Sequence, residues 1–282
     1  MGFESITILG GRGMLGSDLA AIAVGRGLSV RVFDLPEFDI DNEQQVEAAV
    51  SKSEVIVNCA AYTNVEQAEC QAELANEVNG YAVGRLGQIA KEATVPVLHI
   101  STDFVFDGKK EGPYLETDAT GPLSVYGSSK LMGEKLLSQS GCEYCIVRVQ
   151  WTYGAGGDNF VTKILAAAEK NDELNVVDDQ VGSPTSTLEV ANVLCDLLTM
   201  DEFPTGIYHL AARGYANRFE MTQYLFDHLG IKTKVCPCKS SDYKTAAQRP
   251  LNSCFNCAKL ESLLGRPMPT WQEMLDNYLT TE

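Results

Sequence analysis

The 282-residue chain has no long apolar run and is poor in basic residues. No stretch reaches the roughly 18 to 20 apolar residues that a membrane-spanning helix requires, and no charged-then-apolar leader opens the sequence. With 38 acidic against 22 basic residues, the formal net charge is −16 and the pI is about 4.6. Such a chain offers no basic face to a phosphate backbone. We therefore expect a cytoplasmic protein that binds neither nucleic acid nor membranes.

Metal-ligating patterns are also scarce. Of the three histidines, His99 and His209 lie in apolar runs and are expected to be satisfied core residues, and His228 falls on a helix surface. The nine cysteines are an odd number and favour reduced thiols over a disulfide framework. No metal site is predicted.

Four of the cysteines leave one alternative open. Cys236, Cys238, Cys254 and Cys257 read C-x-C and then C-x-x-C, which offers four thiolates to a zinc ion. Against zinc, Cys254 and Cys257 flank Phe255 just before a helical pattern, where cysteine serves as a small apolar residue. Core packing is the favoured interpretation.

The first half of the chain alternates short β-rich runs with longer helical patterns, which is typical of βαβ units and a parallel sheet. The expected strands are Ser5–Leu9, Ser29–Phe33, Val55–Asn58, Val97–Ile100 and Tyr144–Val149, and the expected helices are 14–26, 43–51, 71–93 and 126–139. The strands are almost continuously apolar, as expected when both faces are buried. The predicted fold class is α/β, a Rossmann-type doubly wound parallel sheet with its ligand at the carboxyl ends of the strands.

After Val149 the alternation weakens and turn-rich stretches appear, which indicates a smaller C-terminal substrate-binding region. A helical pattern at 187–199 and the apolar run Ile207–Leu210 predict a return to the first sheet. We therefore expect a discontinuous boundary. Residues 1–149 plus about 187–210 would form a dinucleotide-binding domain, and about 150–186 plus 211–282 a substrate-binding domain.

A glycine-rich loop follows the first expected strand. Gly10, Gly13 and Gly16 permit a tight turn, close backbone approach to a pyrophosphate, and close packing of helix on strand. The N-terminus of the next helix then presents unpaired N–H groups to the anion. Because the strand and the helix are both present, dinucleotide binding is favoured over a plain strand-to-helix turn.

Asp34 closes the second expected strand, where a carboxylate accepts hydrogen bonds from an adenosine ribose 2′-OH. The same carboxylate repels a 2′-phosphate, and no Arg or Lys follows it before Lys52. NAD(H) is therefore favoured over NADP(H). The alternative is an ordinary strand-ending aspartate.

Tyr126 and Lys130 lie four residues apart at the start of a helical pattern, so both project from one face. A neighbouring ammonium favours the ionised phenol and is expected to lower its pKa toward a range useful for proton transfer. The hydroxyl of Thr102, at the end of the fourth strand, can give a second hydrogen bond to a substrate carbonyl. These residues predict a site that reduces a ketone by hydride transfer.

This combination of glycine loop, threonine and Tyr-x-x-x-Lys resembles the extended short-chain dehydrogenase/reductase family. Four further stretches look like those of the dTDP-4-dehydrorhamnose reductase family: residues 58–66, 101–108, 177–185 and 249–253. The similarity runs from Ile6 to about Leu279. It implies NAD(P)H-dependent reduction of the 4-keto group of a nucleotide-activated deoxysugar, giving dTDP-L-rhamnose or a close analogue.

The resemblance also implies roles for individual residues. Tyr126 would be the proton donor, and Lys130 would hold the nicotinamide ribose and tune Tyr126. The implied cofactor contacts are Gly13, Met14 and Leu15 at the pyrophosphate, Asp39 and Ile40 at adenine, and Ala60, Ala61 and Tyr62 after the third strand. The implied sugar contacts are Thr102, Asp103 and Trp151, the last of which has a core aromatic as its alternative interpretation.

Three positions depart from the family pattern. Phe104 stands where Tyr is usual and Gln150 where Ser or Thr is common, which leaves the identity of the sugar open. Leu35 stands where many members carry an Arg able to meet a 2′-phosphate, which again favours NAD(H). The family leaves a magnesium ion and a homodimer open, and the sequence assigns residues to neither.

Two other functions remain alternatives. One is a noncatalytic, cofactor-binding regulatory protein resembling the regulatory subunit of methionine adenosyltransferase. The other is a sugar-nucleotide epimerase or dehydratase that shares the Tyr/Lys pair. A dehydratase would need an acidic pair beside Thr102, but Asp103 is followed by Phe104.

Overall fold

Residues 2–281, which the computed structural model describes, are organised around a six-stranded parallel sheet with the order β2-β1-β3-β4-β5-β10. Its strands are β1 Ser5–Leu9, β2 Ser29–Phe33, β3 Ile56–Asn58, β4 Val97–Thr102, β5 Tyr144–Val149 and β10 Gly206–Leu210. The order reverses between β1 and β3, because the chain moves outward from β1 to β2 and then returns to the other side of β1. A parallel sheet opens a ligand crevice at such a reversal.

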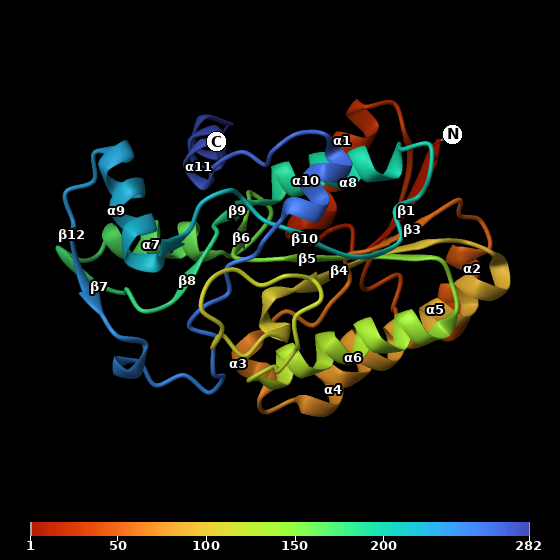
Figure 1. Ribbon diagram of the computed structural model, residues 1–282, viewed down its shortest axis with the longest axis horizontal. Helices are drawn as coiled ribbons and strands as arrows, with labels where there is room; N and C mark the ends of the chain where they lie inside the picture. Colours follow the sequence, from red (N-terminus) through yellow and green to blue (C-terminus); the bar gives the residue numbers. More distant parts are fainter. Residues whose placement is uncertain (1, 282) are drawn as a thin grey trace.

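Helices cover both faces of this sheet, which confirms the doubly wound fold class (Figure 1). The helices are α1 Met14–Gly25, α2 Glu43–Val50, α3 Val65–Ala68, α4 Ala72–Asn76, α5 Ala82–Ala93, α6 Val125–Ser140, α7 Phe160–Ala168, α8 Thr187–Leu198, α9 Arg218–Leu229, α10 Ala258–Leu264 and α11 Trp271–Thr281. Helices α1 and α8 pack together over one face, and α2, α5 and α6 lie on the other.

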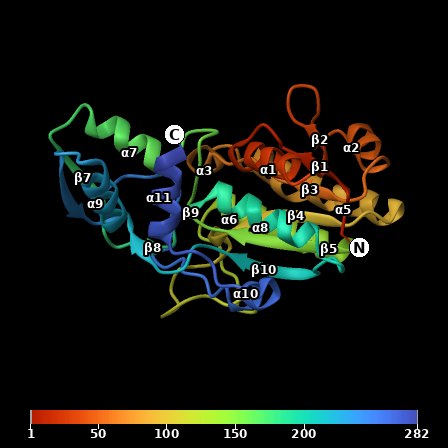
Figure 2. The same cartoon turned by 90° about the horizontal axis from the view of Figure 1, so that it is seen from above.

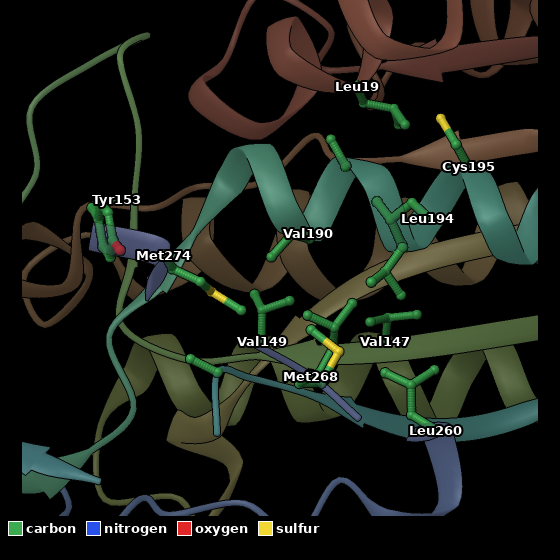
Figure 3. Close-up of a cluster of buried hydrophobic side chains, with 14 of the residues drawn as sticks. Leu19, Val147, Val149, Tyr153, Val190, Leu194, Cys195, Leu260, Met268 and Met274 are labelled. Carbon is green, nitrogen blue, oxygen red and sulfur yellow. The ribbon is translucent and has the colours of Figure 1, made fainter. Parts of the chain in front are cut away.

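A separate hydrophobic core lies under each of these layers. Figure 3 shows the core on the α8 side, where Val147 and Val149 of β5 meet Val190 and Leu194 of α8. These valines come from near-continuous apolar strands, as expected for a sheet that is buried on both faces.

The segment predicted as one helix at 71–93 is divided by a π-helical turn, η1, at Glu77–Tyr81. Such turns are frequent at functional sites. Here the turn directs Asn79 inward, where its Nδ2 atom donates to the Tyr62 carbonyl at 3.0 Å and to Ser129 Oγ at 3.0 Å. Asn79 therefore joins the loop after β3 to α6.

A smaller lobe lies beyond the carboxyl ends of the strands (Figures 1 and 2). It contains α7 and α9 and three two-stranded ribbons, which the sequence analysis did not predict. The paired strands are β6 Thr152–Tyr153 with β9 Thr185–Ser186, β7 Glu173–Val177 with β12 Lys234–Cys238, and β8 Val181–Gly182 with β11 Ala216–Asn217. Four of these strands, β6, β8, β9 and β11, have only two residues and therefore show no periodicity in the sequence.

The cysteines left open for zinc lie in two places. Cys236 and Cys238 are on β12, whereas Cys257 packs near β10, with its Sγ atom 3.8 Å from the Ala211 carbonyl. Within residues 2–281, no group of three or more His, Cys, Asp or Glu side chains is placed to hold a metal ion. No helix in the same range is long and apolar enough to cross a membrane.

Candidate active site

The glycine loop between β1 and α1 is shaped for close approach to a ligand. Gly10 has φ +74°, and a Cβ atom there would lie 2.5 Å from the backbone nitrogen of Ala60. A Cβ atom on Gly16 would lie 2.2 Å from the Gly10 carbonyl oxygen. Only glycine fits either position, so the backbone N–H groups at the start of α1 stay accessible at the β1–β3 reversal.

Asp34, after β2, anchors this loop. Its Oδ2 atom accepts from the Arg12 backbone N–H at 2.7 Å, and its Oδ1 atom accepts from the Leu35 N–H at 2.8 Å. The Arg12 side chain donates to Glu37 Oε2 at 2.7 Å and to the Leu35 carbonyl at 2.9 Å. Arg12 comes from the glycine loop, 22 positions before Asp34, so the residues that follow Asp34 in the sequence gave no sign of this cation.

A cavity of about 870 Å³ runs from this loop to Tyr126 and Trp151. Its volume lies in the range typical of small-molecule and cofactor sites. Of the predicted cofactor and substrate residues, fifteen line it: Gly10, Gly13, Met14, Leu15, Gly16, Asp34, Asp39, Ile40, Ala60, Ala61, Thr102, Asp103, Tyr126, Lys130 and Trp151. The exception is Tyr62, whose hydroxyl donates to Gln71 Oε1 at 2.8 Å.

The expected catalytic residues meet where β4 faces α6. Thr102 ends β4, and Ser124 caps α6 by accepting from the Gly127 N–H at 3.1 Å. This cap begins the helix just before Tyr126, which lines the large cavity together with Thr102. The Phe104 ring packs edge-on against the Tyr126 ring at 5.4 Å between centroids.

The expected effect of Lys130 on the Tyr126 phenol is wrong in this structure. The pKa of Tyr126 is raised to about 12, mainly by burial; the interaction with the Thr102 hydroxyl opposes the rise, and the Asp103 carboxylate adds to it. The reason is the direction of the Lys130 side chain. Its Nζ atom donates to the Ile100 carbonyl at 2.7 Å and lies 3.4 Å from His99 Nε2, so it is bound to β4.

Lys130 is itself 3% exposed. Burial lowers the pKa of its ammonium to about 8, and the charge of Glu134 opposes that fall. The neighbouring His99 is fully buried, and its Nδ1 atom lies 3.1 Å from Asn58 Nδ2. Burial holds the pKa of His99 well below its ordinary value, so this imidazole is the neutral, satisfied core residue that the sequence indicated.

Asp103 is a buried carboxyl beside the reacting groups. Its Oδ1 atom accepts from Thr102 Oγ1 at 3.1 Å, while Oδ2 has no partner within the described residues. Burial raises the pKa of Asp103 to about 6, and hydrogen bonds from Ser253 and Thr102 oppose the rise. A fraction of the molecules therefore carries a proton on Asp103 near neutral pH.

A second cavity, of about 290 Å³, adjoins the first beyond Trp151 and carries three cationic side chains: Lys163, Arg218 and Arg249. The Arg218 guanidinium carbon lies 3.6 Å from the centre of the Trp151 ring and 4.6 Å from that of Phe160. The backbone of Trp151 has φ +46°, and its ring lies 2.7 Å from the Cβ position of Gly182. Trp151 therefore lines the site while supporting Arg218, a contact that the sequence analysis missed.

Comparison with known proteins agrees with this geometry. The chain matches the family model described as RmlD substrate binding domain over residues 4–282. It is 37% identical over 286 residues to the dTDP-4-dehydrorhamnose reductase of Aggregatibacter actinomycetemcomitans, covering 96% of this chain and 97% of that protein. The chain belongs to the dTDP-4-dehydrorhamnose reductase family. The Sinorhizobium fredii reductase is 40% identical over 249 residues, 84% of each chain.

A solved reductase of this family has the same fold. The crystal structure of dTDP-4-dehydrorhamnose reductase from Bacillus anthracis in complex with NADP superposes with a TM-score of 0.94 and 31% identity, covering 99% of this chain and 100% of that one. The resemblance stated from sequence motifs is thereby confirmed at the level of the family.

One departure from the pattern of this reductase family has a structural explanation. The buried Gln150 bridges two loops: its Nε2 atom donates to the Ser253 carbonyl, and its Oε1 atom accepts from the Ser183 N–H at 2.9 Å. A serine or threonine at this position is too short to make both contacts. Gln150 therefore ties the segment after β5 to the lobe that carries Arg249.

Proposed function

We propose that this protein reduces the 4-keto group of dTDP-4-dehydro-L-rhamnose, or of a close nucleotide-sugar analogue, with a nicotinamide cofactor. One observation carries this proposal. Thr102 and Tyr126 line the large cavity that contains the glycine loop, beside Asp103 and Phe104, which also line the smaller cavity with Arg218 and Arg249. A donor pair between a dinucleotide site and an anion site suits the reduction of a sugar attached to a diphosphate.

The residues of the chain have distinct tasks in this reaction. The glycine loop and the N-terminus of α1 would hold the cofactor pyrophosphate, and the bound cofactor supplies a hydride to the carbonyl carbon. With substrate bound, the Thr102 hydroxyl turns from Asp103 Oδ1, to which it donates in the free protein, and donates to the carbonyl oxygen as negative charge develops there. Tyr126 then transfers its phenolic proton to that oxygen. Because the pKa of Tyr126 is about 12, the proton is in place throughout the neutral range.

The smaller cavity, which we assign to the substrate, is marked by its positive charge. The chain carries a net charge of −16, yet Lys163, Arg218 and Arg249 all line the smaller cavity. Such a local reversal of sign concentrates an anion at the site and slows its departure. Guanidinium groups pair well with phosphate oxygens, so we assign these residues to the substrate diphosphate. All three belong to residues 150–186 and 211–282, the proposed substrate-binding domain.

We also propose that NADH is the preferred cofactor. At the adenosine end of the large cavity, Asp34 and Asp39 line the wall together with Arg12, and the carboxylate of Glu37 binds the Arg12 guanidinium. Glu37 already binds that guanidinium, and the pair is exposed to solvent. The local charge therefore suits a ribose 2′-OH better than a 2′-phosphate.

The experiment is a turnover assay with purified protein, dTDP-4-dehydro-L-rhamnose, and NADH or NADPH, followed by the loss of nicotinamide absorbance and by identification of the sugar product. Net cofactor oxidation with formation of dTDP-L-rhamnose supports the reductase. Epimerisation or dehydration without net oxidation would favour the epimerase or dehydratase alternative. Cofactor binding without any change in the sugar would favour the regulatory one.

A further inference from the structure

Helix α6 carries a third polar side chain, Glu134, on the face that carries Tyr126 and Lys130. Glu134 follows Lys130 by four residues, as Lys130 follows Tyr126, so the three share one face of the helix. Glu134 is 3% exposed and lines neither cavity. The reduction described above does not use it, although burying a carboxylate is costly.

The carboxylate of Glu134 is held by two neighbouring strands. Its Oε1 atom accepts from Ser101 Oγ of β4 at 2.5 Å and from Arg148 Nε of β5 at 2.8 Å. Its Oε2 atom accepts from Arg148 Nη2 at 2.6 Å, so the ion pair is bidentate. Each side chain of the pair is 3% exposed.

Every element joined by this carboxylate carries a residue of the site. Ser101 immediately precedes Thr102 on β4, and Arg148 immediately precedes Val149 on β5, which lines the large cavity. Glu134 itself follows Lys130 by one turn of α6. Stability gives little reason for such a pair, because replacing both partners with apolar residues is often neutral or stabilising.

The charge of Glu134 also acts on Lys130. Among the groups packed around the Lys130 ammonium, His99 of β4 is kept neutral by burial and Cys59 after β3 is a thiol whose pKa burial raises to about 12. Tyr126, on the same helix face, is protonated at neutral pH. Glu134 is therefore the anion that supports the charged form of Lys130. Arg148 offsets part of this effect because it is paired with the same carboxylate.

We propose that Glu134 is a positioning residue for the reduction. Held by Ser101 and Arg148, it fixes the α6 face that carries Tyr126 and Lys130 against Thr102. The inference rests on the proposed function for its catalytic consequence, but its effect on Lys130 is measurable without turnover.

Glu134→Gln keeps the size of the side chain and one acceptor oxygen but removes the charge. The expected result is a fall in kcat of about 10- to 100-fold with KM within about 3-fold, because small displacements of aligned groups cost that much. The high-pH limb of the kcat profile should also move to lower pH, because the Lys130 ammonium loses its supporting anion.

A purely structural role is separated by a double variant and a control. Glu134→Met with Arg148→Met removes both charges and should recover Tm relative to Glu134→Gln, while kcat and the pH limb stay shifted. If Glu134→Gln does not fold, the double variant carries the test. The control is Asp196→Asn, which breaks contacts with Arg26 and Arg266 outside the site and should lower Tm without changing kcat.

The second measurement is the pH dependence of the Kd for NADH, followed by nicotinamide fluorescence in the wild type and in both Glu134 variants. If the wild type binds NADH but does not reduce the sugar, the proposed function fails, while a shifted binding profile still supports the role of Glu134. Wild-type kcat and an unshifted binding profile in Glu134→Gln would overturn the inference. A double variant that regains kcat together with Tm would overturn it as well.

Discussion

The cofactor side and the substrate side of this site are built in different ways. On the cofactor side, parallel strands end at one edge of the sheet, and each delivers its residue there: Gly10 after β1, Asp34 after β2, Ala60 after β3 and Thr102 at the end of β4. The substrate side takes its cations from α7, from the start of α9 and from the irregular segment that carries Arg249. In the regular sheet, the strand order alone brings the site residues together at one edge. In the smaller lobe, each site residue is positioned by its own contacts with residues distant in the sequence.

The largest expected effect is on the shared proton donor. Tyr126→Phe removes the transferable proton and leaves the ring in place, so kcat should fall by about 10²- to 10⁴-fold. The Kd for NADH should change little, because the cofactor contacts of the sheet edge are retained. Turnover and cofactor fluorescence titration measure the two quantities. A variant with near wild-type kcat would remove Tyr126 from the mechanism.

A second prediction concerns the stability of the whole protein at acidic pH, which does not distinguish the cofactor side from the substrate side. His99 and His209 are both buried, and burial lowers the pKa of His209 to about 3 and that of His99 well below its ordinary value. The unfolded chain therefore binds protons more readily than the folded one. The stability from these two groups is complete above pH 6.5 and falls as the pH drops below that value.

At pH 5 His209 should cost about 2 kcal/mol of the free energy of unfolding, and His99 adds to this loss. Asp103 acts in the opposite direction, because burial raises its pKa to about 6, and so offsets part of the loss. Urea unfolding at a series of pH values measures the slope. A free energy of unfolding that stays constant from pH 7 to pH 5 would show that the two imidazoles are not held neutral.

The substrate side is probed directly by Arg218→Met. Losing hydrogen bonds to a charged diphosphate should lower kcat/KM for the nucleotide sugar by about 10- to 150-fold, mainly through KM. The Kd for NADH should be unchanged. Lys163→Met is the matched control, because this exposed cation lies in the same cavity and should cost only a few-fold. If Arg218→Met weakens NADH and leaves KM for the sugar alone, the assignment of the two sides is reversed.

This difference between the sides also decides what could be predicted from the sequence. Hydrophobic runs locate strands, and residues just past strand ends converge in a parallel sheet, so Gly10, Asp34, Thr102 and the Tyr126–Lys130 pair could be assigned together. The expected fourth strand was two residues shorter than β4, because the polar Ser101 and Thr102 do not continue the apolar run.

Other features had no local signal. Arg218 begins α9 and reaches Trp151 across 67 positions of the sequence, and neither residue marks the other in any short motif. The prediction that Lys130 lowers the pKa of Tyr126 was wrong for a related reason. Helical spacing placed Lys130 on the correct face, but the direction of its side chain depends on the Ile100 carbonyl and on His99, which only the packed structure reveals.

The smallest expected effect is on cofactor choice. Asp34 and Leu35 favour NADH over NADPH, and the positive charge of Arg12 reduces that preference. A 2′-phosphate would lie near Asp34 and Glu37, but Arg12 supplies partial compensation, so we expect NADH to be preferred by about 5- to 30-fold in kcat/KM, equivalent to about 1 to 2 kcal/mol. Asp34→Ala with Leu35→Arg should reverse the preference. Glu37→Gln releases Arg12 from its ion pair and should improve NADPH by a few-fold without changing KM for the sugar. Equal kcat/KM for the two cofactors in the wild type, together with no gain for NADPH in either variant, would show that Arg12, Asp34 and Glu37 do not distinguish a ribose 2′-OH from a 2′-phosphate.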